Sequence, residues 1–149
     1  MTAGAPAGSP ARSTAWSKAR RPAPLVAAAL VLAGGLWHLA LWNDRYRDLP
    51  DQIPGVEVVK LGFPVNAAVS VVLAGLLLVA GGRLAVLAAA MALEAGSIFA
   101  LVDARTTVVL GWEDKTWDDA AVGILVLEAV ALALLAFLAW RSRRTTLRP

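Results

Sequence analysis

Four long runs of apolar residues constrain this chain more than any other feature of its sequence. They cover about residues 25–42, 64–80, 84–102 and 120–140, and each is almost free of charge. A helix needs about 20 apolar residues to cross the hydrocarbon of a bilayer. A chain of 149 residues of which 58% are hydrophobic has no soluble core large enough to hide such runs. The sequence therefore predicts an all-α, polytopic membrane protein, a bundle of four transmembrane helices.

The hydrophilic segments divide the chain into one transmembrane domain and two tails. Residues 1–23 are small and basic, contain proline and show no apolar pattern, which predicts a disordered cytoplasmic tail. Residues 24–140 hold all four runs, and residues 141–149 form a second basic tail. A cleaved secretory signal at the start is an alternative, but the first apolar run is long for a signal and three more follow it.

The connections between the runs differ in length. A tight Gly81-Gly82-Arg83 turn joins the second and third runs, whereas hydrophilic stretches of residues 43–63 and 103–119 follow the first and third. Pro64 opens the second run, and proline suits the first turn of a helix. We therefore expect the second helix to begin at Pro64 and to form an antiparallel hairpin with the third.

The charges predict that both termini are cytoplasmic. Positively charged residues collect on the cytoplasmic side of membrane proteins. With the N-terminus inside, that side carries nine of the 14 basic residues and no acidic residue: Arg12, Lys18, Arg20, Arg21, Arg83, Arg141, Arg143, Arg144 and Arg148. The outer loops carry nine of the 11 carboxylates, so they are acidic.

A charged segment follows the first apolar run directly. It contains Asp44, Arg45, Tyr46, Arg47 and Asp48, whose charges can pair at neighbouring positions. Proline and glycine a few residues later end the helix. We interpret the segment either as a neutralised helix end at the outer interface or as a recognition surface for an extracytoplasmic partner or ligand.

A few polar side chains interrupt the apolar runs. A charged group at the bilayer centre costs about 2.5–3.5 kcal/mol, so these side chains should face the interior of the bundle. Glu94 precedes Asp103 by nine residues and Glu128 follows Asp119 by nine, which places both glutamates at one depth. We predict an intramembrane polar cluster of His38, Asn66, Ser70, Glu94 and Glu128.

This polar cluster has several interpretations. Its members can hydrogen-bond and hold the helices together, or they can form a binding site for protons or a small solute. A metal site of His38, Glu94 and Glu128 is chemically allowed but has one nitrogen ligand. A haem would need a second histidine from another copy of the chain.

Other chemistries lack their motifs. The chain has no cysteine, so it has no disulfide and no thiolate ligand or nucleophile. It contains no Gly-x-Ser-x-Gly, no His-Glu-x-x-His and no phosphate-binding glycine loop. We therefore expect no catalytic residue, no metal and no cofactor. The charge distribution gives no reason to expect a nucleic-acid partner.

The first two runs resemble a group of small, uncharacterised actinobacterial integral membrane proteins. The residues that carry the resemblance are His38-Leu-Ala-Leu-Trp, Tyr46-Arg-Asp-Leu-Pro and Asn66-Ala, where the group reads H-L-x-L-W, Y-R-D-I-P and N-A. This chain has Arg45 where glycine is common, and a longer insert over residues 51–60. The resemblance implies four helices in an actinobacterial cell membrane and no established activity.

Two functions remain open from the sequence. The first is a non-enzymatic accessory or scaffold protein of the plasma membrane, whose acidic outer loops bind a membrane-protein partner or a second copy. The second is a small transporter or proton-linked component that uses Glu94 and Glu128. The lack of a proline in the middle of any predicted span favours the first, since broken helices often mark transporter sites.

Overall fold

The computed structural model describes residues 22–108 and 111–146, and these residues form helices and loops without a strand. The helices are α1 (Pro22–Leu41), the π-helix η1 (Trp42–Tyr46), α2 (Val56–Ala80), α3 (Leu84–Thr106) and α4 (Asp119–Thr146). All four α-helices are long and apolar enough to cross a membrane. The predicted fold, an all-α protein with four such helices, is confirmed. The cytoplasmic position of both termini stays a prediction.

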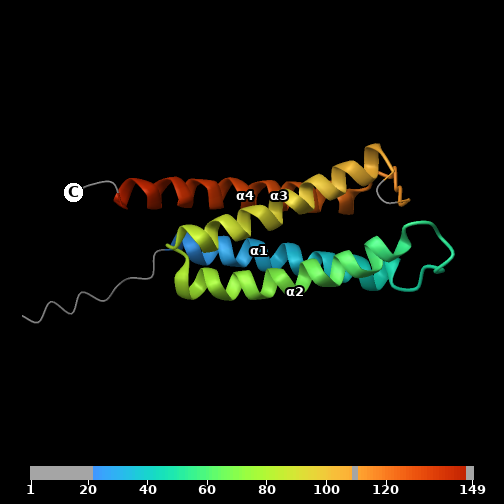
Figure 1. The fold of residues 1–149 in the computed structure, drawn as a ribbon, viewed down its shortest axis with the longest axis horizontal. Coiled ribbons are helices and arrows are strands. Elements are labelled where there is room, and N and C mark those ends of the chain that lie inside the picture. The colour runs from blue at the N-terminus through green and yellow to red at the C-terminus, as the bar shows by residue number, and fades with distance from the viewer. Residues whose placement is uncertain (1–21, 109–110, 147–149) are drawn as a thin grey trace, which may run out of the picture.

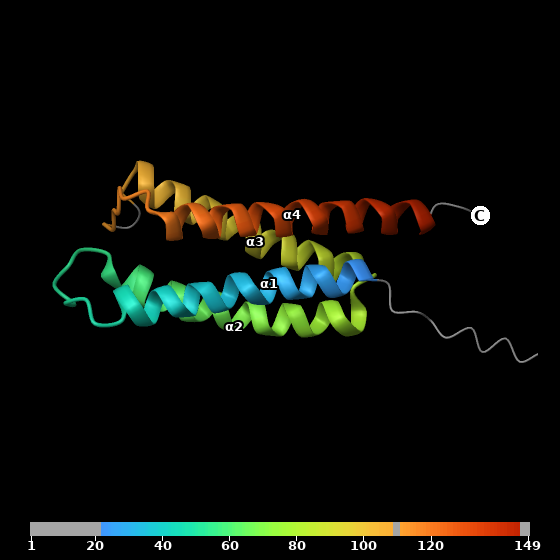
Figure 2. The same ribbon diagram turned by 180° about the vertical axis from the view of Figure 1, so that it is seen from behind.

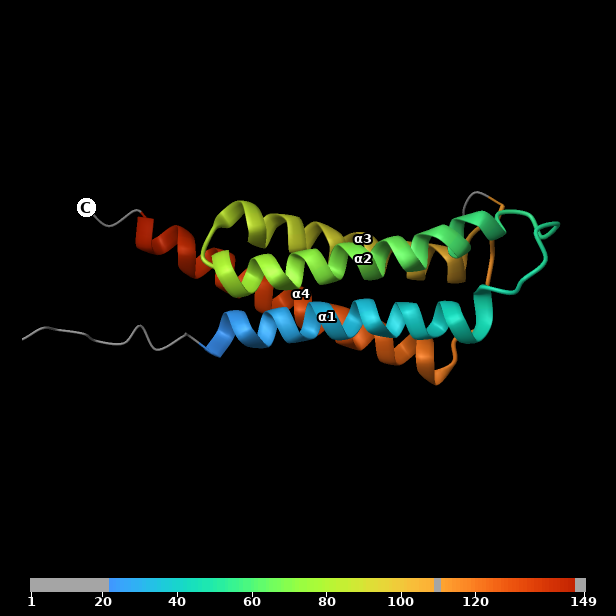
Figure 3. The same cartoon turned by 90° about the horizontal axis from the view of Figure 1, so that it is seen from below.

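The four helices lie side by side in an elongated bundle (Figure 1). α1 packs along α2 on one side and contacts α4 on another, and α3 packs on α4 (Figures 2 and 3). α2 and α3 meet near the turn that joins them and separate toward the opposite end, as Figure 1 shows. The bundle therefore has a closed half and a half in which α2 and α3 diverge.

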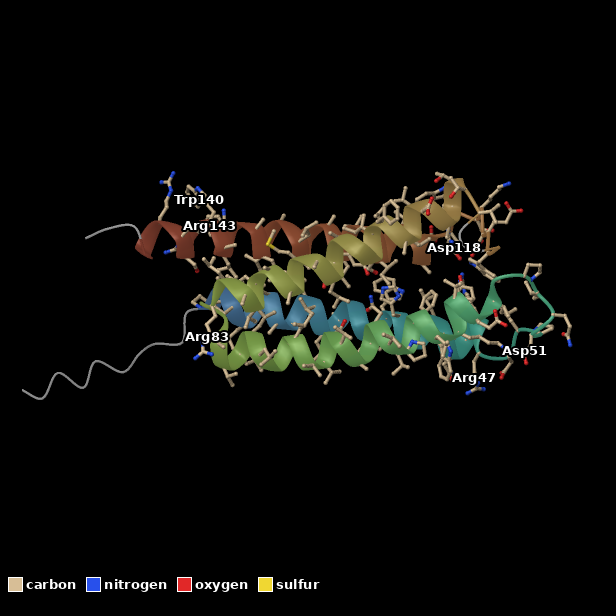
Figure 4. All side chains as sticks on the ribbon, viewed as in Figure 1. Arg47, Asp51, Arg83, Asp118, Trp140 and Arg143 are labelled. Carbon is tan, nitrogen blue, oxygen red and sulfur yellow. The ribbon has the colours of Figure 1, made fainter. Side chains whose placement is uncertain are left out.

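Charged side chains gather at the two ends of the bundle. Arg83 and Arg143 lie at one end with Trp140, and Arg47, Asp51 and Asp118 lie at the other (Figure 4). We call the first the basic end and the second the acidic end. The helices between them carry few charges, as the hydropathy pattern predicts.

The start of the second helix was predicted wrongly. α2 begins at Val56, after Gly55 with a positive φ of 75°, and Pro64 lies inside it. Proline has no N–H, so Pro64 cannot donate to the carbonyl of Lys60, one turn earlier. The turns before Pro64 are held instead by Val56 and Val59, which are buried.

The helices also extend beyond the predicted spans at their polar ends. η1 continues the first helix to Tyr46, α3 runs to Thr106, and α4 includes Arg141. Asp118 accepts a hydrogen bond from the Ala121 N–H at 2.8 Å and so caps the start of α4. Of the predicted tails, residues 1–21 and 147–149 lie outside the described residues.

The closed half contains the main apolar core. Alanines bring the helices close together, and leucines from three helices fill the space between them. The buried members are Ala27, Ala28, Val31, Leu73, Ala74, Leu77, Leu87, Ala90, Leu135 and Leu138. Packing of this kind suits a membrane, where helices associate through close contact rather than by escape from water.

Two glycines set the position of α1 between its neighbours. A Cβ atom on Gly35 would lie 2.4 Å from the Cβ of Ser70 on α2. A Cβ atom on Gly123 of α4 would lie 2.7 Å from the indole ring of Trp37. Both contacts leave no room for a side chain, so these glycines permit the close approach of α1 to α2 and α4.

Candidate functional site

Three helices bring polar side chains together in the interior of the bundle. The Nε2 atom of His38 on α1 lies 2.7 Å from Glu128 Oε1 on α4 and 2.9 Å from Ser97 Oγ on α3. Ser97 donates a hydrogen bond of 2.5 Å to the same carboxylate oxygen. His38 and Glu128 are 8% and 2% exposed. We call His38 and Glu128 with Ser97 the histidine–glutamate cluster.

The hydrogen bonds of the cluster converge on one carboxylate oxygen. Glu128 Oε1 accepts from Ser97 and, in the matching tautomer, from His38 Nε2–H. The second carboxylate oxygen of Glu128 is buried and has no hydrogen-bond partner among the described residues. No hydrogen bond from His38 Nδ1 is formed within that part of the chain. One nitrogen of the imidazole thus holds the carboxylate, and the other is available.

This arrangement differs from a Ser–His–acid catalytic triad. In a triad the serine and the carboxylate contact different nitrogens of the imidazole, so that the ring can take the serine proton. Here both groups contact Nε2 of His38, and Ser97 donates directly to Glu128. The cluster can hold and release a proton, but it lacks the geometry that activates a serine nucleophile.

The structure divides the predicted polar cluster into two parts. His38 and Glu128 are in contact, and Glu94 is buried and close enough to Glu128 for their charges to interact. On α2, Ser70 donates a hydrogen bond of 3.3 Å to Asn66, and among the described residues neither side chain hydrogen-bonds to these carboxylates. Asn66 and Ser70 therefore form a separate polar pair on α2.

Ser97 is the cluster member that the sequence prediction missed. It lies three residues after Glu94, on the same face of α3, so helical spacing alone placed it near the glutamates. This spacing was visible in the sequence, but it did not single out Ser97, because serine is common inside membrane helices. Its contact with Glu128 depends on how α3 and α4 pack.

A cavity of about 380 Å³ lies in the acidic half, where α2 and α3 diverge. All four α-helices line it, and most of the lining side chains are apolar. His38, Asn66 and Ser97 lie in its deep end, together with the apolar Val69, Ala92 and Leu93. Some lining residues on α2 and α3 are exposed on the side of the bundle, among them Val65 and Val69. The cavity therefore opens sideways between these two helices.

Aromatic rings follow one wall of the cavity from its deep end to its mouth. The His38 ring meets Phe63 edge-on at 5.1 Å, and Phe63 stacks on Tyr46 at 4.8 Å between ring centroids. Tyr46 in turn meets the Trp112 ring at 6.0 Å. All four residues line the cavity. We call them the aromatic wall.

Ion pairs to the loop before α4 surround the mouth of the cavity. Arg45 pairs with Asp118, and Arg105 pairs with Asp114 at 3.3 Å. Tyr46 donates a hydrogen bond of 3.2 Å to the same Asp114 oxygen. The Arg45 guanidinium lowers the pKa of Asp118 below its ordinary value through a hydrogen bond and its charge. These contacts tie η1 and the end of α3 to the loop before α4.

The predicted recognition segment has two kinds of residue. Arg47 pairs with the adjacent Asp48 at 3.1 Å, as the sequence predicts, and lowers its pKa. Arg45 and Tyr46 instead contact the second loop, so the prediction of purely local pairing is wrong for them. Asp44, Arg47 and Asp48 are exposed and remain available on the surface.

A metal site in the polar cluster is not supported by the geometry. Among the described residues, no group of three or more histidine or carboxylate side chains is placed to hold a metal ion. His38 and Glu128 are in contact through a hydrogen bond, and Glu94 does not converge with them on a common point.

Comparison of the chain with models of known protein families, with curated proteins and with solved structures found no match. The functional argument therefore depends on the chemistry of the cavity.

Proposed function

We propose that this chain is a multi-pass membrane protein that binds a small molecule in the acidic-half cavity and couples the binding to a proton on the histidine–glutamate cluster. One observation carries the proposal. The imidazole of His38 lines the cavity and, through Nε2, holds the buried carboxylate of Glu128. A molecule in the cavity would therefore contact the side chain that holds this carboxylate.

The size and lining of the cavity support this function. Sites for small molecules usually have volumes of about 300–1,000 Å³, apolar walls and a few placed polar groups. The cavity has about 380 Å³, and its deep end presents His38, Asn66 and Ser97. The proposed location is the cell membrane of an actinobacterium, in line with the resemblance of the first two helices.

One of the sequence arguments against a transport role, the absence of a proline inside a span, is weakened because Pro64 lies inside α2. α2 itself continues unbroken from Val56 to Ala80. Pro64 directly follows two residues that line the cavity, Gly62 and Phe63. A proton-linked function is therefore better supported than the accessory role, which depends on the exposed Asp44, Arg47 and Asp48.

The test compares binding in matched glycine variants. Gly96 lines the cavity and Gly75 does not, and a Cβ atom on either meets nothing within 4 Å. The protein in lipid nanodiscs would be dialysed against tetraphenylphosphonium, tetraphenylborate and triphenylmethanol at pH 5.5 and pH 8. We expect at least one of these probes to bind the wild type and Gly75→Phe, and to bind Gly96→Phe much more weakly.

The proton coupling is tested with Glu128→Gln, which keeps the shape of the side chain. Binding of the successful probe should depend on pH in the wild type and lose that dependence in the variant. Equal binding of every probe to the wild type and Gly96→Phe would contradict a cavity function. In that case a partner that co-purifies with the wild type and is lost from Arg47→Ala would support the accessory role.

A further inference from the structure

The lining of the cavity carries one unbalanced charge, that of Arg105. Among the described residues, the charged side chains that line the cavity are those of Arg45, Arg105 and Asp118. Arg45 and Asp118 pair with each other, so together they are neutral. The partner of Arg105 is Asp114, which does not line the cavity. The lining is therefore positive, and its positive charge lies on Arg105.

The guanidinium of Arg105 is buried with few partners. Its side chain is 7% exposed, and its ion pair with Asp114 has an N–O distance of 3.3 Å. A guanidinium has five N–H donors, and the buried Nε of Arg105 has no hydrogen-bond partner among the described residues. Burial of a charge is costly unless the charge is paired and hydrogen-bonded. The oxygen atoms of an anion in the cavity would therefore stabilise this guanidinium.

Asp114 does not depend on Arg105 alone. Its carboxylate accepts hydrogen bonds from the Tyr46 hydroxyl at 3.2 Å and from the Thr116 N–H at 3.1 Å. Both donors stay in place when a second anion shares the guanidinium. An anion can therefore bind Arg105 without leaving the Asp114 carboxylate unpaired.

The place of Arg105 along α3 suits the head of a membrane amphiphile. It lies in the last turn of a helix that is long and apolar enough to cross a membrane. Lipid headgroups lie where the hydrocarbon of the bilayer ends. From Arg105 the lining continues along α3 to Leu93 in the deep end. The two residues are 12 positions apart, or about 18 Å along a helix, which leaves room for an extended chain.

The walls along this path are apolar and have small or short side chains. α3 contributes alanine and glycine one turn apart, and α2 contributes glycine and valine: Gly62, Val65, Val69, Ala92, Gly96 and Ala100. In the deep end, Ser97 is hydrogen-bonded to Glu128 and Asn66 to Ser70, so the ligand needs no second charged group there. The sideways opening between α2 and α3 lets a chain enter from the bilayer.

We propose that the ligand of the cavity is a single-chain amphiphile with an anionic head, such as a carboxylate, phosphate or sulfonate. The head binds Arg105 at the mouth, and the chain lies between α2 and α3 with its end near His38. This inference rests on the proposed function and specifies its ligand. Basic pockets between membrane helices bind anionic headgroups in the same way.

The test compares three probes that have the same chain and different heads. Dodecanesulfonate, dodecyltrimethylammonium and dodecanol would be dialysed against the full chain in phosphatidylcholine nanodiscs, with Gly96→Phe as the background for partition into lipid. We expect cavity-dependent binding that is strongest for the sulfonate. Methanesulfonate, which has the head without the chain, should not compete with it. By the same charge preference, tetraphenylborate should bind better than tetraphenylphosphonium.

Two substitutions in one ion pair have opposite expected effects. Arg105→Gln should weaken dodecanesulfonate binding about tenfold or more and leave dodecanol binding unchanged, because only the sulfonate loses a charged donor. Asp114→Asn should strengthen dodecanesulfonate binding severalfold, because a competing carboxylate is lost while the amide oxygen can still accept from Tyr46. Lys115→Gln, the control, removes a positive charge that is 69% exposed and outside the lining, and it should match the wild type.

Each result has a defined meaning. Cavity-dependent binding of dodecanol or dodecyltrimethylammonium without the sulfonate would overturn this inference and leave the proposed function standing. Competition by methanesulfonate would indicate a site for small anions, and weaker sulfonate binding in both Arg105→Gln and Asp114→Asn would indicate that the pair only holds the mouth together. Either result would also overturn the inference. If no dodecyl or tetraphenyl probe distinguishes the wild type from Gly96→Phe, both proposals fail. If Arg105→Gln does not fold, Asp114→Asn and the three heads in the wild type give the decision.

Discussion

The basic and acidic halves of the bundle contain the same four helices and are held together in different ways. The basic half is closed by alanine and leucine side chains that exclude any polar group from its core cluster. The acidic half has a smaller apolar cluster of Tyr46, Val56 and Val59, together with a cavity and ion pairs to the loop before α4. Close packing is thus concentrated in the basic half, and the cavity that we propose as a binding site lies in the acidic half.

This division follows from the kinds of interaction that can hold membrane helices together. Close packing needs small residues and matched shapes, and it leaves no space for a ligand. A cavity gives up those contacts, so the helices around it must be connected by other means. Here the connections are the hydrogen bonds of His38 to α3 and α4 and the pairs formed by Arg45 and Arg105.

The largest expected effect tests the packing of the basic half. Leu77 is fully buried, whereas its neighbour Leu76 is 40% exposed on the same helix. Leu77→Ala should lower the free energy of unfolding by about 2–5 kcal/mol, because it leaves a hole in the core. Leu76→Ala, the control, should change it by less than about 0.5 kcal/mol. Unfolding in mixed detergent micelles measures both, and equal losses would show that the basic half is not tightly packed.

An intermediate effect tests the contact between α1 and α2 at the border of the two halves. Gly35→Ala would place a methyl group 2.4 Å from the Ser70 Cβ, so the helices must shift apart. We expect a loss of about 1–3 kcal/mol in the free energy of unfolding. Gly34→Ala adds the same methyl group where nothing lies within 4 Å and should not be destabilising. If both variants lost the same unfolding free energy, the cause would be a change within α1 itself rather than the contact with Ser70.

The smallest effect tests the loop contacts of the acidic half. Arg45 lowers the pKa of Asp118, so the pair stabilises the fold above the ordinary value of 3.8 and loses this contribution as the pH falls below it. Arg45→Gln should therefore be less stable than the wild type at pH 7, and the difference should shrink as the pH falls from 3.8 through the lowered pKa of Asp118.

Arg47→Gln is the matched control for that measurement. Arg47 and Arg45 have the same side-chain exposure of 48%, but Arg47 pairs with the next residue. A pair between adjacent residues persists in the unfolded chain, so its loss changes the unfolding free energy little. If the two variants behave alike, the contact of η1 with the loop before α4 does not contribute to stability.

Much of the fold followed from the sequence because hydropathy and helix length determine it. The four helices, the Gly81-Gly82-Arg83 turn and the gathering of charges at the two ends needed only local patterns. The start of α2 did not follow from such a pattern. Proline is tolerated inside a membrane helix when packing holds the neighbouring turns, and that packing comes from residues of another segment.

Part of the candidate site could also be predicted from local patterns in the sequence. Depth along a helix can be counted, so Glu94 and Glu128 were expected at one depth, and His38 with them in the interior of the bundle. Which groups actually touch depends on the rotation and packing of each helix, which separated Asn66 from Glu128 and brought Ser97 to it. The pairing of Arg45 with Asp118 joins positions 73 residues apart, beyond the reach of any local rule.

The two close glycine contacts of α1 have a consequence for motion. α1 receives Ser70 in a notch at Gly35 and inserts Trp37 into a notch at Gly123 of α4, which fixes its axial register against both neighbours. His38 follows Trp37 directly, so the height of the imidazole in the bundle is fixed from two sides. A rearrangement that widens or narrows the cavity must then use the seam between α2 and α3, which has no such notch among the described glycines. In any such rearrangement, α1 and its histidine would be the part that stays in place.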